Sequence, residues 1–148
     1  MGAGAAQKKS GDLIVEADEM WGYVGSKRNP RWVWAALDAD TRQVVGLVIG
    51  DRSEDTARDL WDVLPDEYRA GAIVCTDAWA AYAAVVPPDR HAVGGKGDGI
   101  TNHIERFWCT VRQRCGRFVR KTLSFSKCER NHLGALWDFV RRYNACRQ

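Results

Sequence analysis

Acidic residues stand at three places where the chain could do metal-dependent chemistry. Asp18 lies among apolar neighbours in VEADEMWGYVG (residues 15–25), Asp77 directly follows the apolar run AIVCT, and Glu105 lies in TNHIER. Carboxylates that converge repel one another, and burying them without a partner is costly, so such a cluster needs a cation. Oxygen-only ligands suit Mg²⁺ or Mn²⁺, and a pair of such ions about 3.5 to 4 Å apart can stabilise the attacking and leaving oxygens of phosphoryl transfer. We predict that Asp18, Asp77 and Glu105 are catalytic residues and metal ligands.

Each of these acids also has a plainer interpretation. Asp18 could be a surface acid at the end of a strand, Asp77 could cap a helix that begins at Ala78, and Glu105 could pair with Arg112 or a neighbouring cation. Capping and ligation do not exclude each other. The position of Asp18 within an otherwise apolar strand, rather than in a turn, favours ligation.

Residues near these acids could support such a site. Glu16 could be a fourth, outer ligand or a partner for an arginine, whereas Glu19 is expected to form a salt bridge or lie at the surface. Asn102 and His103 lie within one helical turn of Glu105, where they could orient the scissile phosphate or a metal ligand. A capping asparagine and a surface histidine are the plain alternatives.

Positive charge is concentrated in the last third of the chain. Residues 1–105 contain 11 Lys and Arg against 17 Asp and Glu, whereas residues 106–148 contain 11 against 2. No acid occurs between Arg106 and Lys127. A solvated helix face usually mixes charges of both signs, so this segment indicates a polyanionic partner, DNA. The residues expected to contact backbone phosphates are Arg112, Arg114, Arg117, Arg120, Lys121 and Lys127.

The elements that must position these residues can be read from the hydrophobic pattern. Strands are expected over residues 11–24, 31–37 and 43–49, the last two joined as a hairpin. Ser53 should cap a helix that ends before Pro65; a buried strand then ends at Asp77, and a short helix over residues 78–85 and a strand at residues 91–93 follow. Helical spacing predicts a further helix from Thr101, with Ile104, Phe107 or Trp108, Val111 and Cys115 on one stripe. A last helix is expected over residues 129–147, with Leu133, Leu136, Trp137, Val140 and Tyr143 or Asn144 facing inward.

This order predicts a mixed α/β domain whose central sheet is covered on both faces. Alternation along the first strand places Glu16 and Asp18 on one side and Glu19 on the other. If the first strand and the strand ending at Asp77 are neighbours, Asp18 and Asp77 meet at one edge of the sheet.

Length and composition fit a single domain over residues 12–148 after a flexible tail, residues 1–11. No run is long and apolar enough for a membrane span, and the N-terminal residues lack the apolar core of a signal peptide, so a cytoplasmic location and no membrane partner are expected. The five cysteines form no C-x-x-C pair, which indicates neither a disulfide framework nor a zinc site.

Five stretches together resemble the transposases of the insertion sequence 1 family in order and spacing: DEMWGYVGSKRNPRWVWAALD, GDRS, TDAWAAY, TNHIER and RFVRKTLSFSK. The resemblance covers residues 13–145. It implies an RNase H-like fold, with three antiparallel strands followed by parallel strands, and a DDE triad that falls on Asp18, Asp77 and Glu105. It further implies a prokaryotic transposase that uses Mg²⁺ to cleave transposon ends and transfer strands into target DNA as an oligomer.

The resemblance leaves other functions to be weighed. Family members carry an upstream zinc-finger and helix-turn-helix portion that binds the terminal repeats, and we expect a separate protein or an upstream reading frame to supply it. One alternative is therefore a non-catalytic DNA-binding fragment or regulator of transposition. A second alternative is a nuclease of RNase H type, because the same carboxylates would serve to hydrolyse RNA in hybrids.

Overall fold

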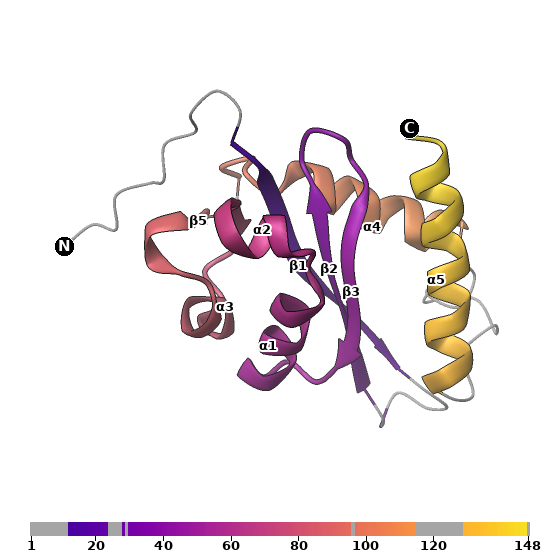
Figure 1. The fold of residues 1–148 in the computed structure, drawn as a ribbon. Coiled ribbons are helices and arrows are strands. Elements are labelled where there is room, and N and C mark those ends of the chain that lie inside the picture. Colours follow the sequence, from indigo (N-terminus) through magenta and orange to yellow (C-terminus); the bar gives the residue numbers. More distant parts are fainter. Residues whose placement is uncertain (1–11, 24–27, 29, 96, 115–128, 148) are drawn as a thin grey trace.

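The computed structural model describes residues 12–23, 28, 30–95, 97–114 and 129–147 (Figure 1). The expected tail over residues 1–11 lies outside the described residues, as do Cys115, Arg117, Arg120, Lys121 and Lys127.

A five-stranded sheet forms the centre of the domain, with the strand order β3-β2-β1-β4-β5. β1 (Ile14–Tyr23), β2 (Pro30–Asp38) and β3 (Val44–Gly50) form an antiparallel meander. β4 (Ile73–Thr76) pairs parallel with β1, and β5 (His91–Val93) pairs parallel with β4. Three antiparallel strands followed by parallel ones in this order confirm the expected α/β, RNase H-like architecture.

Alternation along β1 and β2 divides their side chains between two cores. Val15, Ala17, Trp34 and Ala36 face one core, whereas Met20 and the intervening residues of β2 face the other. Residues two apart in a strand share a face, so both faces of the sheet must be covered. Burial on both sides explains why β2 reads as a nearly continuous apolar run.

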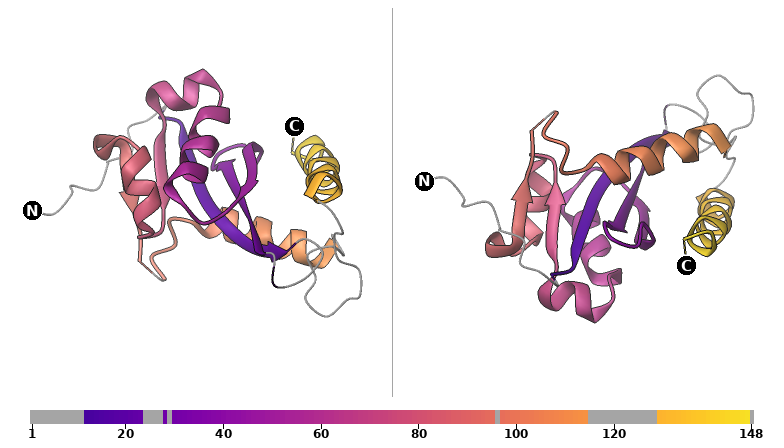
Figure 2. Two further views of the ribbon diagram at one scale, coloured as in Figure 1. Left: turned by 90° about the horizontal axis from the view of Figure 1, so that it is seen from below. Right: turned by 90° about the horizontal axis from the view of Figure 1, so that it is seen from above.

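Helices α1 (Glu54–Val63), α2 (Asp66–Gly71) and α3 (Ala80–Val85) cover the first face (Figure 2). Ser53 caps α1 as predicted, since its side chain accepts a hydrogen bond from the backbone N–H of Thr56. α2 was not predicted as a separate helix. It is a helix of only six residues that follows Pro65, and Tyr68 is its one buried residue. One buried residue gives no helical periodicity that the sequence could reveal.

Helices α4 (Asn102–Arg114) and α5 (Glu129–Ala145) cover the second face. The stripe predicted for α4 is confirmed, because Ile104, Phe107, Trp108 and Val111 are all buried. In α5, Leu136 and Val140 are buried as expected, but the inward placement of Trp137 is wrong, since 38% of it is exposed. Trp137 directly follows the buried Leu136. Amphipathic spacing alone did not show which of these two neighbouring residues faces the core.

None of the helices in the described ranges is long and apolar enough to cross a membrane.

Candidate metal and catalytic site

The parallel pairing of β1 and β4 brings two of the predicted acids to the same level. Glu16 lies opposite Cys75 in this ladder, so two residues further along both strands Asp18 reaches the level of Asp77. β4 is buried at all four positions and ends just before Asp77, whose side chain is exposed. The expectation that the two strands are neighbours is confirmed.

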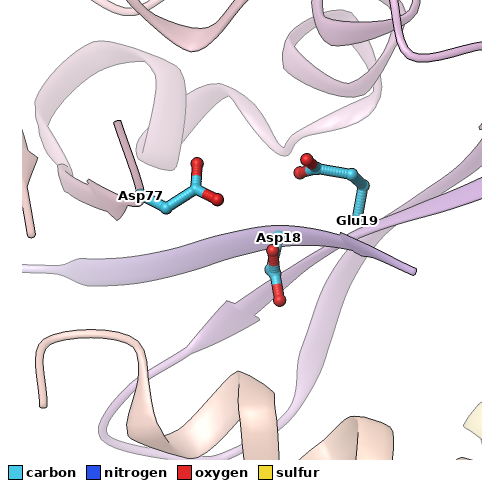
Figure 3. Close-up of side chains that lie close together, drawn as sticks. All are labelled: Asp18, Glu19 and Asp77. Carbon is cyan, nitrogen blue, oxygen red and sulfur yellow. The ribbon is translucent and has the colours of Figure 1, made fainter. Parts of the chain in front are cut away.

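Asp18, Asp77 and Glu19 form a cluster of carboxylates at this point (Figure 3). One oxygen from each side chain lies within 4.8 Å of the others. Within the described ranges, no other group of acids, histidines or cysteines meets this criterion. Asp18 and Glu19 leave opposite sides of β1, and the carboxylate of Asp77 lies on the same side of this strand as that of Glu19 (Figure 3).

Asp18 is held on the α4 side of the sheet. The indole Nε1–H of Trp108 donates a hydrogen bond to its Oδ2 at 3.2 Å. Burial, followed by the negative charge of Glu19 and a smaller effect of Asp77, raises the pKa of Asp18 from 3.8 to about 7. A cation would relieve the repulsion that raises this pKa.

Glu19 lies on the α3 side and is almost completely buried. Its Oε2 accepts a hydrogen bond from the hydroxyl of Tyr82 at 2.6 Å, and its Oε1 receives two N–H groups of Arg52 at 3.0 Å each. Burial raises the pKa of Glu19 even though these partners act in the opposite direction. Glu19 thus forms the salt bridge that was expected but is not a surface residue. Its adjacency to Asp18 in an apolar strand was the signal that could have placed it in the cluster.

Asp77 is oriented by the backbone rather than by a helix end. Its Oδ1 accepts a hydrogen bond from the N–H of Trp79 at 2.9 Å. The alternative that Asp77 caps a helix beginning at Ala78 is wrong, because α3 begins at Ala80 and its N-cap, Trp79, makes no side-chain cap bond. A local turn of this kind is a common role for aspartate and leaves the second carboxylate oxygen available.

The structure does not bring the carboxylate of Glu105 into this cluster. Glu105 is exposed in the first turn of α4 and accepts a hydrogen bond from the hydroxyl of Thr101 at 3.1 Å. Among the described residues no ion pair joins Glu105 to Arg112. Trp108, which binds Asp18, follows Glu105 by three residues and is therefore its neighbour on the helix.

Glu16 anchors the start of α4. Its Oε1 accepts hydrogen bonds from the backbone N–H groups of His103 at 2.9 Å and Ile104 at 3.3 Å, and its Oε2 pairs with His103 Nδ1. Neither an arginine nor the carboxylate cluster is among these partners. Asn102 is exposed at the first position of the helix. Glu16 and His103 thus connect β1 to the helix that carries Glu105.

Comparison with known proteins identifies the family to which this domain belongs. Residues 12–144 match the IS1 transposase family. The chain belongs to this family. It is 34% identical over 131 residues to the InsB protein of insertion element iso-IS1n from Shigella dysenteriae, a match that covers 88% of this chain and 96% of that protein. It is 37% identical over 124 residues to the InsB protein of insertion element IS1 4 from Escherichia coli K12, covering 82% of this chain and 71% of that protein.

Membership in the IS1 transposase family confirms the resemblance drawn from the five motifs and supports a role as a transposase. Asp18, Asp77 and Glu105 are the residues on which that resemblance places the triad. In this IS1 family domain, Asp77 follows the end of β4 and lies close to Asp18 within β1, and Glu105 lies on the helix that contacts Asp18.

The donor set of the cluster fits a hard divalent cation. Asp18, Glu19 and Asp77 offer carboxylate oxygens only, the ligand type that Mg²⁺ and Mn²⁺ prefer. Glu19 already has a cationic partner in Arg52, whereas Asp18 has only the neutral indole of Trp108 among its side-chain hydrogen bonds. Asp18 and Asp77 are therefore the residues best suited to hold a cation.

Of the cations expected to contact DNA, the structure describes the first part of the run. Arg106, Arg112 and Arg114 are exposed on α4. They lie on the helix that also bears Glu105 and Trp108, so α4 combines a basic surface with contact to the acidic cluster.

Proposed function

We propose that this domain cleaves phosphodiester bonds at the ends of its transposable element and joins the freed 3′-hydroxyl to target DNA. The observation that carries the proposal is the proximity of Asp18, within β1, to Asp77, which directly follows the adjacent parallel strand β4, in a chain of the IS1 transposase family. Two carboxylates at this place can hold Mg²⁺ or Mn²⁺, and Glu105 is the third residue proposed to act with them.

When bound, such an ion polarises the phosphodiester and lowers the pKa of a nucleophilic water. The chain's own residues do the rest by positioning. Trp108 holds one oxygen of Asp18, the N–H of Trp79 holds one oxygen of Asp77, and each carboxylate keeps its other oxygen for a ligand. In the first step water cleaves the bond at the element's end and leaves a 3′-hydroxyl. In the second step this hydroxyl attacks a target phosphodiester and displaces a 3′-oxygen of the target strand.

The basic segment is proposed to hold the DNA backbone during both steps. Arg112 and Arg114 on α4, with Arg117, Arg120, Lys121 and Lys127 beyond it, would contact phosphates. Recognition of the terminal repeats is proposed to come from a separate zinc-finger and helix-turn-helix protein or an upstream reading frame. Pairing of two transposon ends implies a homo-oligomer when active, acting on nucleoid DNA in the cytoplasm.

A cleavage and joining assay tests this proposal. The purified chain is incubated with labelled duplex DNA carrying the element's ends and a supercoiled target, in Mg²⁺, Mn²⁺, Ca²⁺ or chelator. Asp77→Asn removes one ligand charge, and Asp89→Asn is the matched control, because Asp89 is an exposed aspartate outside the cluster. Products that form with Mg²⁺, survive in Asp89→Asn and vanish in Asp77→Asn are expected.

A non-catalytic regulator of transposition is the second candidate, because the carboxylate of Glu105 lies outside the cluster. Binding of end DNA without any product in Mg²⁺ or Mn²⁺, with equal affinity in wild type and Asp77→Asn, would favour it. A parallel arm with an RNA–DNA hybrid separates both candidates from an RNase H-type nuclease, which would cut the hybrid and join nothing.

A further inference from the structure

Arg52 occupies an unusual position beside the acidic cluster. It follows β3 in the connection to α1, and its guanidinium lies over the ring of Trp79 at 3.9 Å and over the ring of Trp32 at 4.7 Å. Its Nε and one Nη reach Glu19 Oε1 at 3.0 Å each. The planar guanidinium thus uses its faces for two indoles and its edge for a carboxylate, a combination that lysine cannot reproduce.

Glu19 is fixed at the other end of this contact. Its side chain is 1% exposed, while that of Arg52 is 37% exposed. A buried carboxylate needs partners, and Tyr82 and Arg52 supply them from two different elements. Because Glu19 is adjacent to Asp18 in β1, the Arg52 contact is anchored on the strand that carries Asp18.

Trp79 links Arg52 to the other carboxylate of the cluster. The same residue whose ring stacks on Arg52 donates its backbone N–H to Asp77 Oδ1 at 2.9 Å. The connection between β4 and α3 has no side-chain helix cap to hold it, and Trp79 packs against the core on the α1 side. A continuous path therefore runs from Glu19 through Arg52 and Trp79 to Asp77.

We propose that Arg52 is a positioning residue that fixes the connection carrying Asp77 against the strand carrying Asp18. It does so by clamping Trp79 to Glu19, so that the two carboxylates are preorganised before a cation arrives. Glu19, held in its ion pair with Arg52, supports the site and leaves cation binding to Asp18 and Asp77. The consequence for the reaction rests on the proposed function; the clamp itself does not.

The clamp predicts a local effect of Arg52→Lys that needs no metal. Lysine keeps the charge beside Glu19 but loses the planar stack, so the connection after β4 should open more often. Amide hydrogen exchange at residue 79, followed by NMR without metal, is expected to be about tenfold faster than in wild type. Arg58→Lys is the matched control, because Arg58 is exposed on α1 and pairs only with Glu54 across one turn.

A second readout concerns the cation. Calorimetric titration with Mn²⁺ is expected to give about tenfold weaker binding in Arg52→Lys than in wild type and Arg58→Lys, since preorganisation is lost. A merely structural role would lower the thermal midpoint without selecting the amide of residue 79 or the Mn²⁺ affinity. If Arg52→Lys does not fold, Trp79→Phe and Trp79→Leu test the same clamp. The amide of residue 79 should stay protected from hydrogen exchange in Trp79→Phe, which keeps an aromatic ring, and should lose this protection in Trp79→Leu.

Unchanged exchange at residue 79 in Arg52→Lys, or equal exchange in Trp79→Phe and Trp79→Leu, would overturn the proposal. Faster exchange combined with unchanged affinity, in a wild type that binds Mn²⁺, would also overturn it. A wild type that binds no Mn²⁺ and cuts no DNA, with faster exchange in Arg52→Lys, would uphold the clamp while refuting the proposed function.

Discussion

At the scale of single residues, the main feature of the site is the raised pKa of the Asp18 carboxyl group. Burial and the charge of Glu19 raise the pKa of Asp18 to about 7. The folded protein therefore holds a proton on Asp18 that the unfolded chain releases near pH 3.8. Since the native state binds more protons in this interval, the free energy of unfolding falls as pH rises from about 4 through 7. Above pH 7 the ionised carboxylate is a source of instability that a cation can remove.

Asp18→Asn is accordingly expected to stabilise the metal-free protein while abolishing cleavage. At pH 8 the free energy of unfolding should rise by about 1 to 3 kcal/mol, because asparagine keeps the shape without the buried charge. The gain should disappear at pH 4, where Asp18 is protonated. Thermal midpoints at both pH values measure this. A midpoint that falls equally at both would show that the charge of Asp18 is not the destabilising feature.

Glu105→Gln separates a catalytic role from a structural one. The side chain is exposed and, within the part of the chain that the structure describes, bonds only to Thr101, so the change in the free energy of unfolding should stay within about 0.5 kcal/mol. If Glu105 acts with Asp18 and Asp77, cleavage should fall by at least about 100-fold. Glu67→Gln, an exposed glutamate on α2, is the matched control in the same assay. Cleavage at the wild-type rate in Glu105→Gln would remove Glu105 from the triad.

At the scale of elements, α4 is fixed to β1 by a carboxylate placed at its N-terminus. Negative charge there complements the helix dipole and satisfies N–H groups that have no partner within the helix. Glu16→Leu would remove the acceptor from the partly buried backbone N–H of His103 and from the buried N–H of Ile104. We expect the free energy of unfolding, measured with denaturant, to fall by about 2 to 4 kcal/mol in this variant. In Glu16→Gln, which keeps an acceptor, it should fall by only about 1 kcal/mol. Equal stability of both variants would contradict this role.

One side chain of α5, that of Asn144, forms hydrogen bonds with the backbone of the edge strand β3. Asn144 accepts from the N–H of Val44 at 2.8 Å and donates to the carbonyl of Val44 at 3.1 Å, as a neighbouring strand would. Asn144→Ala should lower the free energy of unfolding by about 1 to 2 kcal/mol, because the backbone of Val44 loses two hydrogen bonds. Amide exchange at Val44 in the edge strand should become faster for the same reason. Arg142→Ala, in an exposed pair with Asp138, is the control. Unaltered exchange at Val44 would show that apolar packing alone holds α5.

Much of this architecture could be predicted because its signals are local. Strand alternation, the Ser53 cap and the stripe of α4 each depend on residues close in sequence, and the structure confirms them. The contacts within the site were harder to predict, because the residues that form them come from distant segments of the chain. Nothing in the residues around Arg52 indicates that its guanidinium lies between Trp32 and Trp79, and no periodicity distinguishes a buried Glu19 from a surface one. Such contacts follow from sheet pairing, which periodicity does not specify.

At the scale of the whole molecule, the helices that cover the two faces of the sheet expose side chains of opposite charge. The exposed acids of α1 and α2 are Glu54, Asp55, Asp59, Asp62, Asp66 and Glu67. On the opposite face, α4 exposes Arg106, Arg112 and Arg114. DNA would be repelled by the first face and attracted to the second, so the charge distribution orients a duplex toward the helix that contacts Asp18.

The salt dependence of DNA binding tests this orientation. Each phosphate contact contributes about 0.9 to the slope of log K against log salt, through release of counterions. The double variant Arg112→Gln with Arg114→Gln should therefore reduce the slope by about 1.8 in fluorescence-anisotropy titrations with duplex DNA. The charge-matched control, Arg58→Gln with Arg69→Gln on the α1 and α2 side, should leave the slope unchanged, because the acidic face makes no phosphate contact. Equal reductions in both double variants would mean that binding follows net charge alone and that α4 does not face the DNA.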